Sequence, residues 1–126
     1  LKSITGTAQY EVNKLSAELG NADVELVRKE LGTEFDMIVH EPDGILEIGQ
    51  AGHSKASGIE RLCASLGIAK EDTYAFGDSA NDVEMLETVG MGYAMSNAAP
   101  GIAGHAKYIT DSVEEVLEDI LAGLDL

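Results

Sequence analysis

The sequence predicts an α/β protein in which a parallel sheet is flanked by helices and a smaller α/β unit precedes it. Two observations lead to this class. From residue 53 onward, amphipathic helices alternate with short apolar strands, whereas earlier in the chain two apolar strands follow each other across a turn. Strands joined through helices form right-handed crossovers in parallel sheets that helices cover on both faces. The change of pattern at residues 49–53 marks the expected boundary.

The first quarter of the chain predicts two helices. Residues 9–20 place Val and Leu side chains at helical spacing and end at a glycine. Residues 21–32 repeat this pattern, with Asn21 as the N-cap and Gly32 as the stop. Residues 35–40 and 45–50 then have the composition of strands, and the Glu-Pro-Asp-Gly turn signal between them predicts a hairpin.

The rest of the chain predicts helices and strands in alternation. The expected helices cover residues 55–67, 81–90, 99–106 and 111–124, and the expected strands cover residues 72–78, 92–96 and 107–110. Ser112 and Glu115 have the spacing of a capping box at the start of the last helix. Cys63 lies on the apolar stripe of the first of these helices, which predicts a small core residue rather than a nucleophile.

Composition excludes several classes of partner. The chain has 8 basic and 23 acidic residues, so a nucleic-acid surface, which needs clustered Lys and Arg, is not expected. No stretch approaches the roughly 20 apolar residues of a membrane span, so no membrane partner is expected either. A single cysteine fits a reducing cytoplasm. Because the chain does not begin with methionine, we expect a fragment of a longer protein.

One acidic turn, Gly-Asp-Ser-Ala-Asn-Asp, is the strongest candidate site. Asp78 stands where an apolar strand ends, and ligands of parallel sheets collect beyond the carboxyl ends of the strands. Gly77 is expected to let the backbone turn sharply there. A Mg²⁺ ion would suit the site, because it takes one or two carboxylates together with phosphate oxygens and water. Lys55 opens the helix that leads into this strand, so it is expected to reach the same crevice.

Other interpretations of this turn remain open on residue types alone. Asp, Ser and Asn at these positions also make an ordinary tight turn and helix cap. An EF-hand loop does not fit, because Ala80 and Val83 stand where an oxygen ligand and a glycine are needed. Gly-Asp-Ser is also the signature of GDSL-type ester hydrolases, with Ser79 as nucleophile. That family carries its base in an Asp-x-x-His segment, and none of the three histidines lies in one.

Residues 46–112 resemble the C-terminal part of Cof-type phosphatases of the haloacid dehalogenase-like superfamily. The resemblance rests on the Lys55 helix start, the Gly-Asp-Ser-x-Asn-Asp turn, a Met-Leu pair, the "AMSNA" segment and the "YIT" strand, all in family order. It implies a Rossmann-like fold and a magnesium-dependent phosphatase of small phosphorylated metabolites such as sugar phosphates. It also implies that residues 1–48 are the tail of an α/β cap domain and residues 49–126 are part of the phosphatase core.

The resemblance also assigns roles to single residues. Lys55 would bind and polarise the phosphoryl group, with Asn81 and Asn97 as further substrate contacts. Asp78 and Ser79 would form the metal loop. Asp82 would also belong to the catalytic and metal site, orienting Lys55 or a metal-bound water.

The chain departs from the family pattern in three places. Ala56 and Ser96 stand where glycine is usual, and no Asp-x-Asp segment, which carries the nucleophile and the general acid and base of the family, follows an apolar strand. We therefore expect little turnover from this chain alone, and either self-association or pairing with the missing N-terminal part. Two alternatives are a non-catalytic binding or assembly protein that keeps part of the fold, and a phosphoryl mutase. An Asp-x-Asp-Gly segment encoded upstream would exclude the non-catalytic protein.

Overall fold

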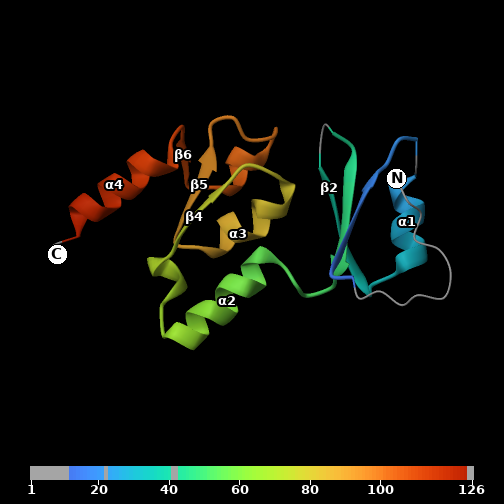
Figure 1. Cartoon of the computed structure of the whole chain (residues 1–126), viewed down its shortest axis with the longest axis horizontal. Coiled ribbons are helices and arrows are strands. Elements are labelled where there is room, and N and C mark those ends of the chain that lie inside the picture. The colour runs from blue at the N-terminus through green and yellow to red at the C-terminus, as the bar shows by residue number, and fades with distance from the viewer. Residues whose placement is uncertain (1–11, 22, 41–42, 125–126) are drawn as a thin grey trace.

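The computed structural model describes residues 12–21, 23–40 and 43–124, and contains two three-stranded sheets that lie side by side (Figure 1). The antiparallel sheet comprises β1 (Lys14–Glu18), β2 (Phe35–His40) and β3 (Ile45–Gln50). The parallel sheet comprises β4 (Tyr74–Gly77), β5 (Met91–Met95) and β6 (Tyr108–Thr110). The α/β class and the parallel sheet flanked by helices are thus confirmed.

The antiparallel sheet has β3 at its centre. The predicted hairpin is confirmed, because β2 pairs with β3 from Phe35 opposite Gln50 to His40 opposite Ile45. Residues 41–42 of its turn lie outside the described residues. The other edge of β3 is occupied by β1, with Lys14 opposite Gly49. By the alternation of a pleated strand, one face of this sheet therefore carries Lys14, Asp36, His40 and Glu47 together.

The helix predicted over residues 9–20 is wrong for its described part, which forms strand β1. Val12 and Leu15 remain 59% and 55% exposed, so the helical spacing of the apolar residues does not correspond to a buried face. Lys, Leu, Ala and Glu are good helix formers, but the ladder offered by the open edge of β3 outweighs that weak local preference. Residues 9–11 lie outside the described residues.

Helix α1 (Val24–Leu31) confirms the second predicted helix, but not its N-cap. Asp23 caps it instead of Asn21, and its carboxylate accepts hydrogen bonds from the backbone N–H of Glu25 and of Leu26. The stop at Gly32 is confirmed, and φ there is +62°, a conformation that favours glycine.

The parallel sheet has the order β4-β5-β6 and packs its small-residue face against helices. Helix α3 (Val83–Thr88) and the 3₁₀ turn η3 (Ile102–His105) lie on that face, where Leu86, Ala94 and Ile102 form the buried core. The predicted short helix over residues 99–106 is thus a 3₁₀ turn. Gly92 permits the close packing, because a Cβ there would lie 2.6 Å from the Leu86 carbonyl oxygen. The opposite face carries the stacked rings of Phe76, Tyr93 and Tyr108.

Helix α2 (Lys55–Leu66) leads from the antiparallel sheet toward the parallel one. It ends at Gly67 in the left-handed conformation, as predicted, and Cys63 is buried on its inner side. The 3₁₀ turn η1 (Lys70–Asp72) then precedes β4, and a third, η2 (Ala80–Asp82), precedes α3. Helix α4 (Val113–Gly123) begins at Ser112, which accepts a hydrogen bond from the Glu115 N–H.

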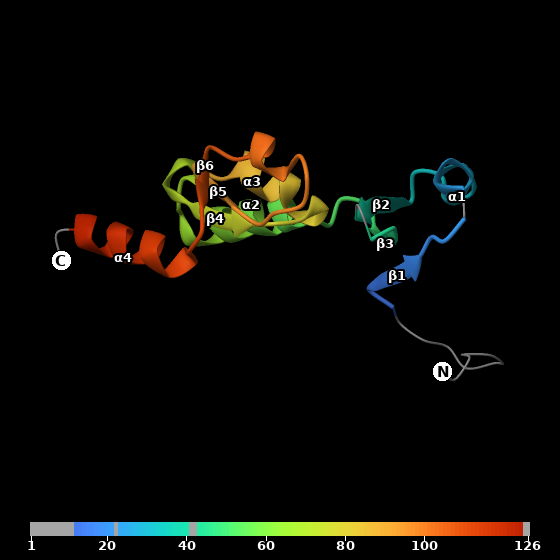
Figure 2. The same cartoon turned by 90° about the horizontal axis from the view of Figure 1, so that it is seen from above.

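The molecule is elongated, with α1 and α4 at opposite ends and the two sheets between them (Figure 2). Strand β2 approaches η2, so the antiparallel sheet contacts the turn that carries the candidate site. None of the helices in the described part of the chain is long and apolar enough to cross a membrane.

Candidate active site

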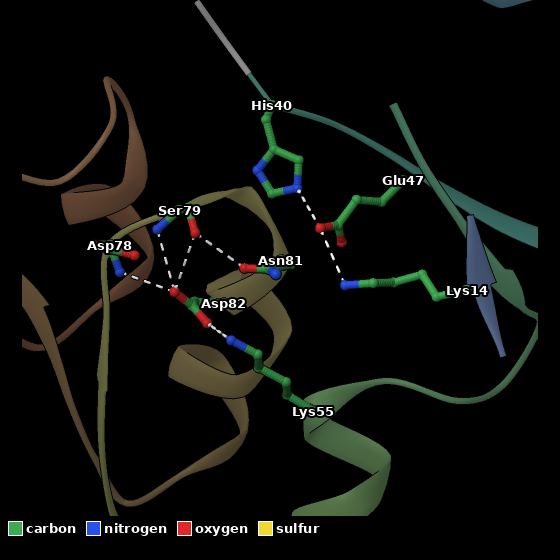
Figure 3. A network of polar contacts seen from close by, with 8 residues as sticks. All are labelled: Lys14, His40, Glu47, Lys55, Asp78, Ser79, Asn81 and Asp82. Carbon is green, nitrogen blue, oxygen red and sulfur yellow. Dashed lines mark hydrogen bonds and ion pairs between the residues drawn. The ribbon is translucent and has the colours of Figure 1, made fainter. Parts of the chain in front are cut away.

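Asp82 is the centre of the candidate site. Its side chain is only 5% exposed, and each carboxylate oxygen has its own set of donors. Oδ1 accepts from Lys55 Nζ, and Oδ2 accepts from the backbone N–H groups of Asp78, at 2.9 Å, and of Ser79, at 3.2 Å (Figure 3). The carboxylate therefore joins the carboxyl end of β4 to the first turn of α2.

Local structure at the start of α2 places Lys55. Ser54 caps the helix, its Oγ accepting from the Ser57 N–H at 3.2 Å while the Ser57 hydroxyl receives a hydrogen bond from the Ser54 N–H at 2.9 Å. This reciprocal box fixes the direction of the first turn. The structure brings Lys55 to the carboxyl end of β4, where its ammonium group forms an ion pair with Asp82. The role of Ser54 was missed, although Ser-x-x-Ser ahead of an apolar stripe is a recognisable signal.

Burial and hydrogen bonding act in opposite directions on Asp82. Burial by itself would raise the pKa of its carboxyl group, but hydrogen bonds from Lys55 and from the Asp78 and Ser79 backbone, together with the Lys55 charge, outweigh it. The pKa of Asp82 therefore lies below its ordinary value. The carboxylate stays ionised and holds the ammonium group of Lys55 at the end of β4.

Gly77 has a different role from the predicted one. It does not adopt a positive φ, so no unusual turn requires a glycine there. A Cβ at Gly77 would lie 2.6 Å from the Asp82 Cβ. The glycine therefore makes room for the Asp82 side chain.

The remaining predicted residues lie around this carboxylate. Asp78 is exposed just beyond β4, and none of the described residues forms an ion pair with its carboxylate. The Ser79 hydroxyl donates to Asn81 Oδ1 at 3.0 Å. Asn97 is exposed in the turn after β5 and makes no hydrogen bond to these residues, but its loop is attached to them through the Ala99 N–H, which donates to the Asp78 carbonyl at 2.8 Å.

A cavity of about 960 Å³ lies between the two sheets, and Lys55 and Asn81 line its wall on the parallel-sheet side. The antiparallel sheet contributes Lys14 and Glu47 to the opposite wall. Sequence reasoning missed these two residues, because β1 was assigned to a helix and its face could not be paired with β3.

The donors suit a weakly held hard cation better than a closed metal centre. Asp78 offers a free carboxylate, whereas both oxygens of Asp82 are engaged. In the described ranges no group of three or more His, Cys, Asp or Glu side chains could hold a metal ion. This set fits Mg²⁺, which needs few carboxylates and completes its shell with phosphate and water.

The ester-hydrolase interpretation is not supported, because none of the described hydrogen bonds gives Ser79 a histidine base. Ser79 Oγ contacts Asn81 and Asp82, and none of the described hydrogen bonds joins it to a histidine. His105 Nδ1 lies instead 2.7 Å from Glu87 Oε1, and His40 lies beside Glu47. A serine nucleophile would need a histidine within hydrogen-bond reach.

Comparisons with known sequences agree with this fold. A family model of haloacid dehalogenase-like hydrolases matches residues 3–118. A phosphoglycolate phosphatase of Methanothermobacter thermautotrophicus is 32% identical, over 82% of this chain and 50% of that protein. A 5-amino-6-(5-phospho-D-ribitylamino)uracil phosphatase of Bacillus subtilis, YcsE, is 34% identical over 75% of this chain and 37% of that protein. The chain thus spans half or less of these two relatives.

A solved structure leads to the same family. A haloacid dehalogenase-like hydrolase from Bacteroides thetaiotaomicron has a TM-score of 0.69 and 30% identity, covering 89% of this chain and 45% of that one. The resemblance found in residues 46–112 thus extends over nearly the whole chain. The protein belongs to the haloacid dehalogenase-like hydrolase family.

Proposed function

We propose that the protein is a magnesium-dependent phosphatase of small phosphorylated metabolites, and that these 126 residues carry the phosphate-binding and metal-binding half of its site. One observation carries the proposal. Lys55 and Asp82, 27 positions apart in sequence, meet at the carboxyl end of β4, where the backbone N–H of the exposed Asp78 also donates to Asp82, and Lys55 lines a cavity. This combination of fixed cation, free carboxylate and space suits a phosphate monoester.

Each residue has a distinct task in the proposed reaction. The Lys55 ammonium group would bind the phosphoryl oxygens and stabilise the charge that develops on them in the transition state. Asp82 positions Lys55, and its engaged oxygens favour this task over direct metal ligation. Asn81 and Asn97 would contact the substrate from the rim. Asp78 and Ser79 would hold Mg²⁺, which supplies further positive charge to the phosphoryl group when bound.

The proposed domain division follows the same scheme. Residues 1–48 would be the C-terminal part of the cap and residues 49–126 the C-terminal part of the core, with β3 ending just past the division at Gln50. The nucleophilic aspartate would come from a segment outside these residues. This chain alone would then show little or no turnover, and it would self-associate or pair with that segment.

The two named relatives differ in the leaving group of the phosphate ester for which each is named. One is named for phosphoglycolate, whose leaving group carries a carboxylate, and the other for a phosphate ester of a ribityl group, which carries hydroxyls. Both are small phosphate monoesters, which is the class proposed here.

The test is the Asp78→Asn variant of the full-length protein, assayed with an aryl phosphate in the presence of Mg²⁺. We expect activity to fall by about a hundredfold or more, because the variant loses the free carboxylate that would hold the metal. The fold should persist, since Asp78 is exposed. Asp72→Asn, in the exposed turn η1, is the matched control and should retain activity. Unchanged activity in Asp78→Asn would refute the metal assignment.

A further inference from the structure

The wall of the cavity opposite Lys55 carries a carboxylate, that of Glu47, whose position is fixed by neighbouring side chains. Glu47 on β3 has a side chain that is only 19% exposed, and Lys14 Nζ on β1 donates to its Oε1 at 3.2 Å. His40 Nε2 on β2 lies 3.5 Å from the same oxygen. Side chains of all three strands therefore meet at the Glu47 carboxylate. Figure 3 shows the Glu47 side chain extending from the antiparallel sheet toward the side where Asn81 and Lys55 lie.

Glu47 is an anion with a free acceptor. Burial would raise the pKa of its carboxyl group, but the hydrogen bond and charge of Lys14, with a smaller effect of the nearby His40, hold it below its ordinary value. The contacts with Lys14 and His40 both use Oε1, and none of the described residues engages Oε2. An ionised oxygen without a partner accepts hydrogen bonds strongly and repels other anions.

The nearby Lys14 does not remove the preference of Glu47 for hydrogen-bond donors over anions. Lys14 is paired with Glu47 and offers remaining N–H donors beside the free Oε2, so the face presents a donor next to an acceptor. That pattern matches hydroxyl groups, each of which both donates and accepts. Arg28 also lines the cavity and contacts the exposed Glu25 only loosely, with Nε 3.8 Å from its carboxylate, so discrimination against a carboxylate depends on Glu47 outweighing this cation.

We propose that Glu47, held by Lys14 and His40, is a specificity residue that selects phosphate esters whose leaving group carries hydroxyls and rejects those whose leaving group carries a carboxylate. The proposal rests on the function proposed above, which places the phosphoryl group at Lys55. The leaving group must then extend into the cavity toward the antiparallel sheet.

The test compares two substrates in the full-length protein: ribitol 5-phosphate, with hydroxyls, and 2-phosphoglycolate, with a carboxylate. The wild type should have the higher kcat/KM for ribitol 5-phosphate. Glu47→Gln removes the charge at constant shape, so we expect this preference to fall about tenfold, since charge-assisted hydrogen bonds are roughly twice as strong as neutral ones. Its kcat/KM for 2-phosphoglycolate should rise, because the repulsion is gone. Glu30→Gln, exposed on α1, is the matched control and should leave the preference unchanged.

A second variant distinguishes an effect of charge in the cavity from a nonspecific loss of activity. Lys14→Met leaves Glu47 without its cation, so kcat/KM for 2-phosphoglycolate should fall, opposite to the change in Glu47→Gln. A wild-type preference for 2-phosphoglycolate, or a preference unaffected by Glu47→Gln, would overturn the specificity proposal. Either result, with hydrolysis of an aryl phosphate intact, would leave the proposed phosphatase standing. A wild type that hydrolyses no phosphate ester would refute both.

Discussion

The two sheets of this protein differ in how closely neighbouring side chains and helices pack against their strand backbones. In the parallel sheet, added Cβ atoms at Gly77 and Gly92 would each lie 2.6 Å from a neighbouring atom, because Asp82 and helix α3 press directly on the strands. In the antiparallel sheet, a Cβ at Gly49 would meet nothing within 4 Å. The candidate catalytic groups are attached to the crowded sheet, and the candidate specificity groups to the open one.

This difference matches the two tasks that the sheets are proposed to perform. Phosphoryl transfer needs groups held in one geometry, and Asp82 gains that geometry from Lys55 and two backbone N–H groups. Selection of a leaving group tolerates more freedom, and Lys14 and Glu47 lie on a sheet whose β1 residues are all exposed and whose β3 residues are mostly half-buried. The crowded sheet should therefore respond to substitution far more strongly than the open one.

The largest contrast should come from two leucines that are each 2% exposed, Leu86 on α3 and Leu46 on β3. Leu86→Ala leaves a cavity in the buried core and should lower the free energy of unfolding by about 3 to 5 kcal/mol. Leu46→Ala should cost less, about 2 kcal/mol, because the open sheet can collapse around the gap. Urea denaturation measures both. In Leu46→Ala, amide hydrogen exchange should show loss of protection confined to residues 14–50. Equal loss of protection in both sheets would contradict the claim that the two sheets respond separately to substitution.

A smaller contrast should come from two strand glycines. Gly77→Ala forces a Cβ against Asp82, so we expect a loss of about 1 to 3 kcal/mol in the free energy of unfolding. Gly49→Ala is the matched control in the open sheet, and there the change should stay within about 0.5 kcal/mol. Thermal unfolding of the two variants decides the point. If Gly77→Ala is as mild as its control, the described approach of Asp82 to β4 is wrong.

The smallest expected effect concerns pH. Because the folded-state pKa of Asp82 lies below its ordinary value of 3.8, the unfolded chain takes up the proton first as the pH falls. The stability contributed by Asp82 is therefore present above that value and is lost as the pH falls through the folded-state pKa. Asp82→Asn should cost about 1 to 2 kcal/mol near pH 7, and less below pH 3.8. Denaturation midpoints measured across pH would show the difference, and a constant difference at all pH values would rule out this linkage.

The sequence predicted most of the parallel-sheet half and less of the antiparallel one. Capping residues, glycine stops and short apolar runs are local signals, so α2, β4 to β6 and α4 were found close to their observed positions. In the segment that became β1 the local signals pointed to a helix, because its residues are good helix formers that end at a glycine, whereas its strand depends on pairing with β3. The Asn21 cap failed for a related reason, since Asp23 two positions later was equally suited.

In the candidate site, the residue types were predictable, but most of their detailed contacts were not. Lys55, Asp78, Ser79, Asn81 and Asp82 were all recognised from a lysine at a helix start and an acidic turn after a strand. Nothing in their order shows that Asp82 divides its two oxygens between Lys55 and the backbone, or that Gly77 exists to make room for it.

The sequence by itself thus determined the α/β class, the parallel sheet and the family, and it supplied the candidate site residues, because each rests on short motifs that can be recognised in their order along the chain. The tertiary structure alone decided that β1 is a strand, that Asp82 divides its two oxygens between Lys55 and the β4 backbone, and that Lys14 and Glu47 line the cavity across from Lys55. These depend on residues distant in the chain meeting through strand pairing and packing, which no local pattern specifies.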